Sequence, residues 1–167
     1  MKQLLQQYAA YNHWANKVLT DRIAQLPAEI ITKETPGSFP SLFATVVHLV
    51  DIESIWWQRM RLQEQVEWPG KTFQGDFEAL SRQLLLLSQQ WYEWIAAAHE
   101  SSLIHVFAYY NSQKEYFKQP VCEMLMHLFN HQSYHRGQLV AMLRQNGIRK
   151  IPRSDFIVFS RKKEKIR

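Results

Sequence analysis

The sequence has a single cysteine and no long apolar run. These two absences argue against a disulfide-bonded secreted protein and against a membrane-spanning one. Cys122 has no partner for a disulfide within the chain, which fits a reducing compartment. No apolar stretch approaches the ~18 residues of a membrane-spanning helix, and the first residues, MKQLLQQYAAYNHW, lack the apolar segment of a secretory signal. We therefore expect a cytoplasmic protein with no membrane partner.

The main part of the chain also lacks an excess of basic residues. The formal net charge is +5, yet residues 149–167 alone carry eight basic and two acidic residues, so the preceding part has a net charge of −1. The basic tail, roughly residues 160–167, is typical of a solvated terminus and is also able to contact nucleic-acid phosphates. We do not expect the folded domain to bind nucleic acid.

Apolar residues recur at intervals of three and four in four segments, and this spacing predicts four long helices. The segments cover residues 3–26, 41–63, 77–98 and 120–147. Ser41 and Asp76 are the expected N-caps of the second and third helices, and Gly147 is the expected stop of the fourth. With 167 residues the chain has the size of one domain, so we predict an all-α fold, a single four-helix bundle.

Two segments depart from this periodicity. Residues 103–119, LIHVFAYYNSQKEYFKQ, place aromatic and β-branched residues on both sides of the turn-like NSQK. This pattern predicts a short hairpin or extended loop between the third and fourth helices. After Gly147 we expect an extended C-terminal tail whose Phe156, Val158 and Phe159 dock on the bundle.

The fourth helix carries an unusual ladder of histidines. His127, His131 and His135 are spaced by four residues, and the apolar stripe of the helix runs into His131, His135 and Gln138. Buried polar groups cost several kcal/mol unless they are satisfied. Either a neighbouring carbonyl or carboxylate pairs with each ring, or two rings one turn apart bind a metal ion through bonds of ~2.0–2.1 Å. His127 and His135 are ~12 Å apart in helix rise, so one ion cannot bind all three rings.

A third ligand for such an ion must come from another helix. His48 lies among apolar residues on its face of the second predicted helix. His13, His99 and His105 fall in a more exposed strip, a last helical turn and the hairpin, respectively. Burial therefore favours His48.

Gly137 is a further irregularity, because a glycine inside a helix costs about 1 kcal/mol relative to alanine. We expect it to admit another helix or to leave room beside a metal ion. Arg136 and Gln138 flank it, and either side chain is placed to orient a ligand by hydrogen bonding. Tyr134 is expected at the mouth of the pocket.

These features together resemble the DinB/YfiT-like family of helical metalloproteins, across nearly the whole chain. The matching segments are YNHWAN at 11–16, TVVHLVDIESIWW at 45–57 and NHQSYHRGQL at 130–139. The resemblance implies a bundle of unusual connectivity, commonly a homodimer, with one divalent ion per chain held by His48, His131 and His135. It places His127 beside the site. Imidazole ligands suit several metals, of which we expect zinc or nickel.

Three neutral imidazoles and an open fourth position suit a catalytic ion. Gln132 stands where the HExxH motif of zinc proteases has its glutamate, so we do not expect protease-type hydrolysis. Relatives in the broader superfamily use small thiols, which implies a metal-dependent transferase acting on a low-molecular-weight thiol in detoxification or stress response. One alternative is a non-catalytic protein whose metal, closed off by Asp51 or Glu53, braces two helices. The other is DNA binding through the basic tail.

Overall fold

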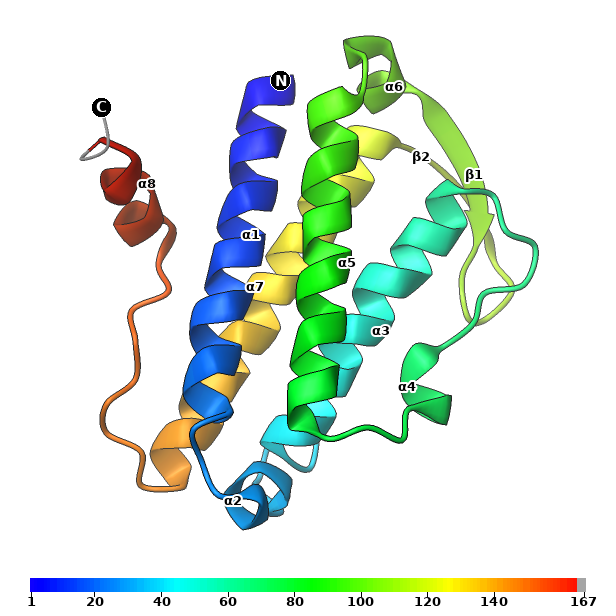
Figure 1. Ribbon diagram of the computed structural model, residues 1–167. Helices are drawn as coiled ribbons and strands as arrows, with labels where there is room; N and C mark the ends of the chain where they lie inside the picture. The colour runs from blue at the N-terminus through cyan, green and yellow to red at the C-terminus, as the bar shows by residue number, and fades with distance from the viewer. Residues whose placement is uncertain (165–167) are drawn as a thin grey trace.

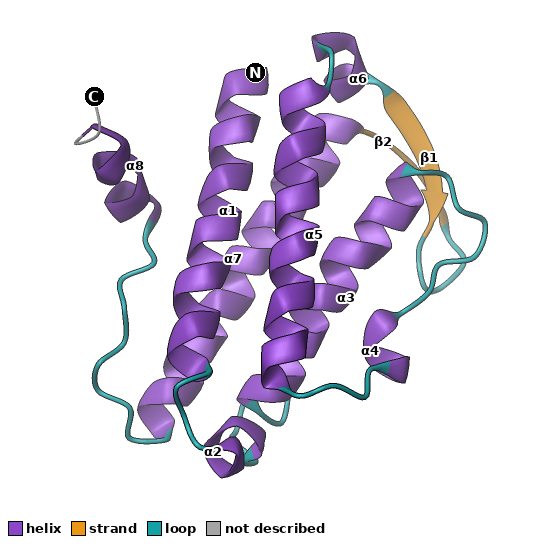
Figure 2. Cartoon of the chain, in the orientation of Figure 1, coloured by secondary structure: helices purple, strands orange, loops and turns teal. Residues whose placement is uncertain are grey.

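The structure is a computed structural model that describes residues 1–164, with side chains through residue 161. The expected basic tail therefore lies largely outside the described residues. Figure 1 follows the chain, and Figure 2 shows that helices account for most of it. In chain order the elements are α1 (Lys2–Ile23), α2 (Ala28–Thr32), α3 (Leu42–Met60), α4 (Pro69–Thr72), α5 (Phe77–Ala97), α6 (Glu100–Ile104), β1 (Val106–Tyr110), β2 (Tyr116–Pro120), α7 (Val121–Gln145) and α8 (Phe156–Glu164).

The four long helices form the predicted bundle. Helix α5 packs against α1 and α3, and α7 packs against the same two helices. In Figure 1, α1 and α7 run in one direction while α3 and α5 run in the other. Because α3 and α5 are parallel, the connection between them, which contains α4, must return along the length of the bundle. This connection is the unusual element of the topology.

Local sequence signals mark the helix ends as expected. Ser41 Oγ accepts a hydrogen bond from the Ala44 N–H at 3.1 Å, and Asp76 Oδ1 accepts one from the Ala79 N–H at 2.8 Å. These two caps satisfy amide groups that lack partners within a first helical turn. Gly147 follows α7 with a φ of +77°, a left-handed conformation that glycine adopts without a steric cost.

The connection between α6 and α7 is the predicted hairpin. Strands β1 and β2 pair antiparallel, from Val106 opposite Pro120 to Tyr110 opposite Tyr116. The hairpin contacts both α3 and α7. It therefore lies against these two helices, and the Tyr109 ring of β1 contacts the Trp56 ring of α3.

The C-terminal segment differs from the predicted extended tail. Residues 148–155 are irregular, but the following residues form α8. Phe156 and Phe159 both face Tyr11 of α1, with ring centroids 5.2 Å and 5.9 Å away. A spacing of three places both rings on one side of a helix, whereas in a strand they would point to opposite faces. The docking of these two phenylalanines is confirmed, and the extended conformation is wrong for α8.

The core is divided by a polar layer. One apolar cluster includes Trp91 and Phe129, and the other includes Leu42, Leu80 and Leu139. Buried polar side chains lie between the two clusters, and they are Asn12, Asn16, Glu53, Ser88, Gln132 and Arg136. Among residues 1–164, none of the helices is both long and apolar enough to cross a bilayer.

Candidate metal centre

Three histidine rings from two helices converge on one point. His48 belongs to α3, and His131 and His135 belong to α7. His131 Nε2 lies 3.4 Å from His48 Nε2 and 3.2 Å from His135 Nε2, and the candidate ligand atoms of all three rings lie within 4.8 Å of one another. The spacing of four aligns His131 with His135 on α7. The packing of α3 against α7 then adds His48 from a part of the chain 83 residues away.

These separations fit a divalent ion. A tetrahedral ion with bonds of ~2.0–2.1 Å keeps its ligand atoms about 3.3–3.4 Å apart, close to the two measured values. No carboxylate or cysteine joins the three histidines in this group within the described residues. The arrangement therefore suits an ion held by three imidazoles, with a fourth position left for a small molecule.

The rings carry no positive charge near neutral pH. Burial, reinforced by His135 and His131, lowers the pKa of His48 from 6.5 to about 4. Burial, reinforced by His135 and His127, lowers the pKa of His131 to about 4 as well. Burial also lowers the pKa of His135. A neutral imidazole has the lone pair that a metal ion requires.

Gln138 sets the tautomer of His135. Its Oε1 accepts a hydrogen bond from His135 Nδ1 at 3.0 Å, which leaves the Nε2 lone pair directed at the cluster. Gln138 Nε2 in turn donates to Ser38 Oγ at 2.8 Å. Gln138 thus has the position next to a ligand that the sequence suggested, whereas nothing in the sequence pointed to Ser38.

The connection between α2 and α3 covers the other side of the cluster. The Phe39 ring stacks on the His48 ring with centroids 4.3 Å apart and also lies 5.6 Å from the His135 ring. This contact restricts the orientation of His48. Sequence reasoning missed Phe39, because a single aromatic residue between prolines carries no periodic signal.

The buried face of α7 only partly matches the predicted stripe, although His135 is buried as expected. Gln132 and Arg136 are buried, while His131 and Gln138 are half-buried at the edge of the bundle. Gln132 Nε2 donates to the Leu49 carbonyl at 3.0 Å and so ties α7 to α3. The side chain at position 132 therefore faces α3, and a glutamate there would not face the cluster.

Neither of the two carboxylates named for the non-catalytic alternative belongs to the histidine group. Asp51 Oδ1 accepts a hydrogen bond from the Gly70 N–H at 2.7 Å. Glu53 Oε1 accepts one from Asn12 Nδ2 at 2.8 Å, inside the polar layer. Both carboxylates are engaged in these hydrogen bonds, so the structure does not bear out an ion closed off by Asp51 or Glu53.

His127 and Tyr134 lie beside the cluster on its solvent side. The ring centroids of His127 and His131 are 5.8 Å apart. Partial burial and the positive charge of Arg59 lower the pKa of His127. Tyr134 is 63% exposed, and its ring meets the His135 ring edge-to-face at 5.0 Å. Both rings therefore lie next to a candidate ligand.

Arg136 and Gly137 do not have the expected roles. Although Arg136 follows His135, its guanidinium is buried and donates to Asn12 Oδ1 at 2.7 Å and to Asn16 Oδ1 at 2.9 Å. It therefore serves the polar layer and not a candidate ligand. A Cβ added to Gly137 would meet no atom within 4 Å, so neither a neighbouring helix nor the cluster requires glycine there.

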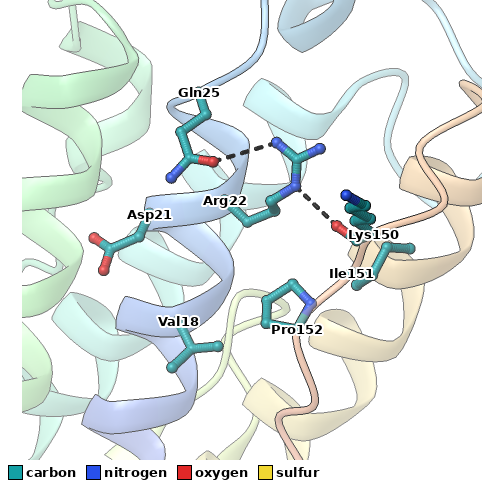
Figure 3. A pocket seen from close by; sticks show the side chains of 7 residues that line it. All are labelled: Val18, Asp21, Arg22, Gln25, Lys150, Ile151 and Pro152. Atoms are coloured by element: carbon teal, nitrogen blue, oxygen red, sulfur yellow. Dashed lines mark hydrogen bonds between the residues drawn. The ribbon is translucent and has the colours of Figure 1, made fainter.

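Another hollow on the surface does not include the cluster. A cavity of about 730 Å³ lies between the end of α1 and residues 150–152, where Arg22 Nε donates to the Lys150 carbonyl at 2.9 Å (Figure 3). No histidine or cysteine lines it. The metal-binding chemistry therefore points to the histidine cluster.

The bundle and the cluster together define a class, helical proteins with a three-histidine centre between two helices. The DinB family model matches residues 1–163. Protein DinB from Bacillus subtilis (strain 168) is 30% identical over 152 residues, which cover 85% of this chain and 86% of that protein. The crystal structure of a DinB-like protein from Bacillus cereus ATCC 10987 is similar with a TM-score of 0.70, at 19% identity over 89% of this chain and 94% of that chain. The chain belongs to the DinB family.

Proposed function

We propose that the protein holds a divalent ion, zinc or nickel, at His48, His131 and His135 and is a transferase that acts on a low-molecular-weight thiol. The observation that supports this is the set of three neutral imidazoles with no protein carboxylate in the group. A divalent ion held by these three residues would lower the pKa of a thiol in the fourth position and would stabilise the thiolate nucleophile.

The transfer itself needs an electrophilic second substrate. The thiol proton passes to water, the sulfur electron pair forms a bond to the electrophilic carbon, and the leaving group departs with its bonding pair. The protein contributes rigid positioning. Gln138 fixes the tautomer of His135, and Phe39 holds the His48 ring by stacking. In this proposal the exposed side chains of His127 and Tyr134, whose rings lie next to those of His131 and His135, contact the substrates.

A second candidate function is a non-catalytic metal brace. The cluster joins α3 to α7, so an ion would cross-link two helices that are distant in the sequence. In that case removal of the metal lowers the melting temperature, and no thiol changes the spectrum of the bound ion.

Metal content is the first test. Inductively coupled plasma mass spectrometry on protein purified without a histidine tag compares wild type with His48→Ala, His135→Ala and His127→Ala. We expect about one ion per chain in wild type and in His127→Ala, and almost none in the other two variants. Wild-type protein that contains no metal and takes up neither zinc nor nickel would contradict the proposal.

Thiol chemistry is the second test. The metal-loaded protein and the same protein after chelator treatment are incubated with a small thiol and 1-chloro-2,4-dinitrobenzene. We expect conjugation above the spontaneous rate in the loaded wild type, and its loss in the treated protein and in His48→Ala. If the protein binds metal but neither catalyses conjugation nor shows a change in the spectrum of the bound ion with several thiols, the non-catalytic metal brace would be favoured.

A further inference from the structure

Arg59, near the end of α3, has a half-buried side chain with no anionic partner among the described residues. Its guanidinium lies over the Trp56 ring at 4.8 Å and near the Tyr109 ring at 5.4 Å. Its Nε is buried and has no hydrogen-bond partner. None of the ion pairs between described side chains includes Arg59. A partly desolvated cation without a counter-ion is costly in a folded protein.

The guanidinium and the histidine cluster lie along the same side of the molecule. The Trp56 ring, over which the Arg59 guanidinium lies, also contacts the His127 ring, with ring centroids 5.4 Å apart. The centroids of the His127 and His131 rings are 5.8 Å apart. Trp56 follows His48 by eight residues on α3, which corresponds to about 12 Å of helix rise. The Trp56 and His127 rings therefore lie between the Arg59 guanidinium and the histidine cluster. The distance between these two groups is roughly the length of a small molecule.

We propose that Arg59 is the anion-binding residue of this site, and that it holds a carboxylate or phosphate group at the far end of a substrate whose reactive end lies at the three histidines. The inference rests on the proposed function and names the class of its substrate, an elongated small molecule with an anionic group. Arginine suits this role because its planar N–H groups match the oxygens of a carboxylate or phosphate. The rings of Trp56 and Tyr109 hold the guanidinium group of Arg59 in place and reduce its contact with water.

The test compares ligands that differ in charge and length. Cobalt-loaded protein is titrated with 6-mercaptohexanoate and 6-mercaptohexanol, and with mercaptoacetate and 2-mercaptoethanol, while thiolate-to-cobalt absorption reports binding. We expect wild type to bind the six-carbon acid about tenfold more tightly than the six-carbon alcohol. The two-carbon acid is too short to reach Arg59 and should show a smaller preference over its alcohol.

Arg59→Met retains most of the side-chain stem but removes the charge, and we expect it to abolish the preference for the six-carbon acid. Its cobalt content and its affinity for the six-carbon alcohol should match wild type, and its melting temperature should not fall, because the variant removes a costly unpaired charge. Arg61→Met is the matched control, since Arg61 is exposed just after α3 and its loss changes the net charge equally. That control should keep the tenfold preference.

Other outcomes separate this inference from the proposed function. A six-carbon acid that binds no more tightly than its alcohol, or a preference that survives in Arg59→Met, would overturn the role of Arg59 even if thiols bind. If no thiol binds, suberic acid monohydroxamate and octanohydroxamate serve as a second charged and neutral pair. An Arg59-dependent preference there supports the anion site and rejects the thiol. Absence of that preference, or failure to take up cobalt, overturns both proposals.

Discussion

His135 Nδ1 donates a hydrogen bond to Gln138 Oε1 at 3.0 Å, so the ring directs an unprotonated Nε2 toward His48 and His131. The orientation of a candidate ligand therefore depends on a residue that does not itself face the ion. Metal sites commonly rely on such outer partners of histidine, and their loss typically costs 10–100-fold in metal affinity.

We accordingly expect Gln138→Leu to weaken zinc binding by about 10–100-fold, because His135 then lacks its acceptor. Gln138→Glu keeps an acceptor and should stay close to wild type. Competition with a coloured chelator gives the Kd of each variant. Ser38→Ala, which removes only the outer hydrogen bond to Gln138, should have a smaller effect. Unchanged affinity in Gln138→Leu would show that the hydrogen bond does not control the ligand.

The polar layer should make stability depend on pH through Glu53. Burial raises the pKa of Glu53 from 4.5 to about 7, although hydrogen bonds from Asn12 and Ser88 act in the other direction. Between these values the unfolded chain releases the proton while the folded protein retains it, so the free energy of unfolding falls as pH rises. The contribution is up to about 3 kcal/mol across this window.

Glu53→Gln removes that titration. Histidines with lowered pKa values make the free energy of unfolding rise with pH over a similar pH range. The quantity to compare is therefore the difference in unfolding free energy between the variant and wild type. We expect the unfolding free energy of Glu53→Gln relative to wild type to rise between about pH 5 and about pH 8. Urea unfolding at several pH values measures it. A difference that does not change with pH would mean that Glu53 keeps an ordinary pKa in the folded protein.

Gln132→Glu should not create a protease, although it completes the HExxH motif. The side chain faces the Leu49 carbonyl, and a carboxylate in place of the amide donor would put two acceptors together in a buried place. We expect destabilisation of about 2 kcal/mol or more and no peptide hydrolysis by the zinc-loaded variant. Gln132→Leu, which removes the amide without adding charge, should be less destabilised. Peptidase activity in Gln132→Glu would refute this placement of the side chain.

Gly137→Ala should stabilise the protein. The position lies inside α7, and a Cβ would meet no atom within 4 Å. Alanine is better than glycine in a helix interior by about 1 kcal/mol, partly because it restricts the unfolded chain. Thermal unfolding measures the gain, and zinc content should be unchanged. A loss of stability or of metal would indicate that the glycine is needed for the site after all.

Much of the fold follows from local patterns. Helix positions are well predicted because their signals are local. These signals are the three-four spacing of apolar residues, the caps Ser41 and Asp76, and the stop at Gly147. The hairpin is a local structure for the same reason. The pair His131 and His135 needs only helical geometry. The addition of His48 rested on burial and on the resemblance to a family.

The surroundings of the candidate site depend on how the helices are rotated against one another. Each residue turns a helix by about 100°, so His135 faces the cluster, Arg136 the polar layer and Gly137 open space. A small error in the inward stripe of α7 was therefore enough to misplace Arg136. On α3, Asp51 and Glu53 likewise bond to Gly70 and Asn12 and not to the cluster.

The sequence by itself thus determined the four long helices, the hairpin and the histidine pair, because hydrogen bonding along a helix and capping are decided between near neighbours. Only the tertiary structure decided that α3 brings His48 to that pair and that Phe39 and Gln138 hold the rings. It also decided that the buried Nε of Arg59 has no hydrogen-bond partner among the described residues. These contacts join residues far apart in the chain. They depend on the packing of whole helices, which no single segment specifies.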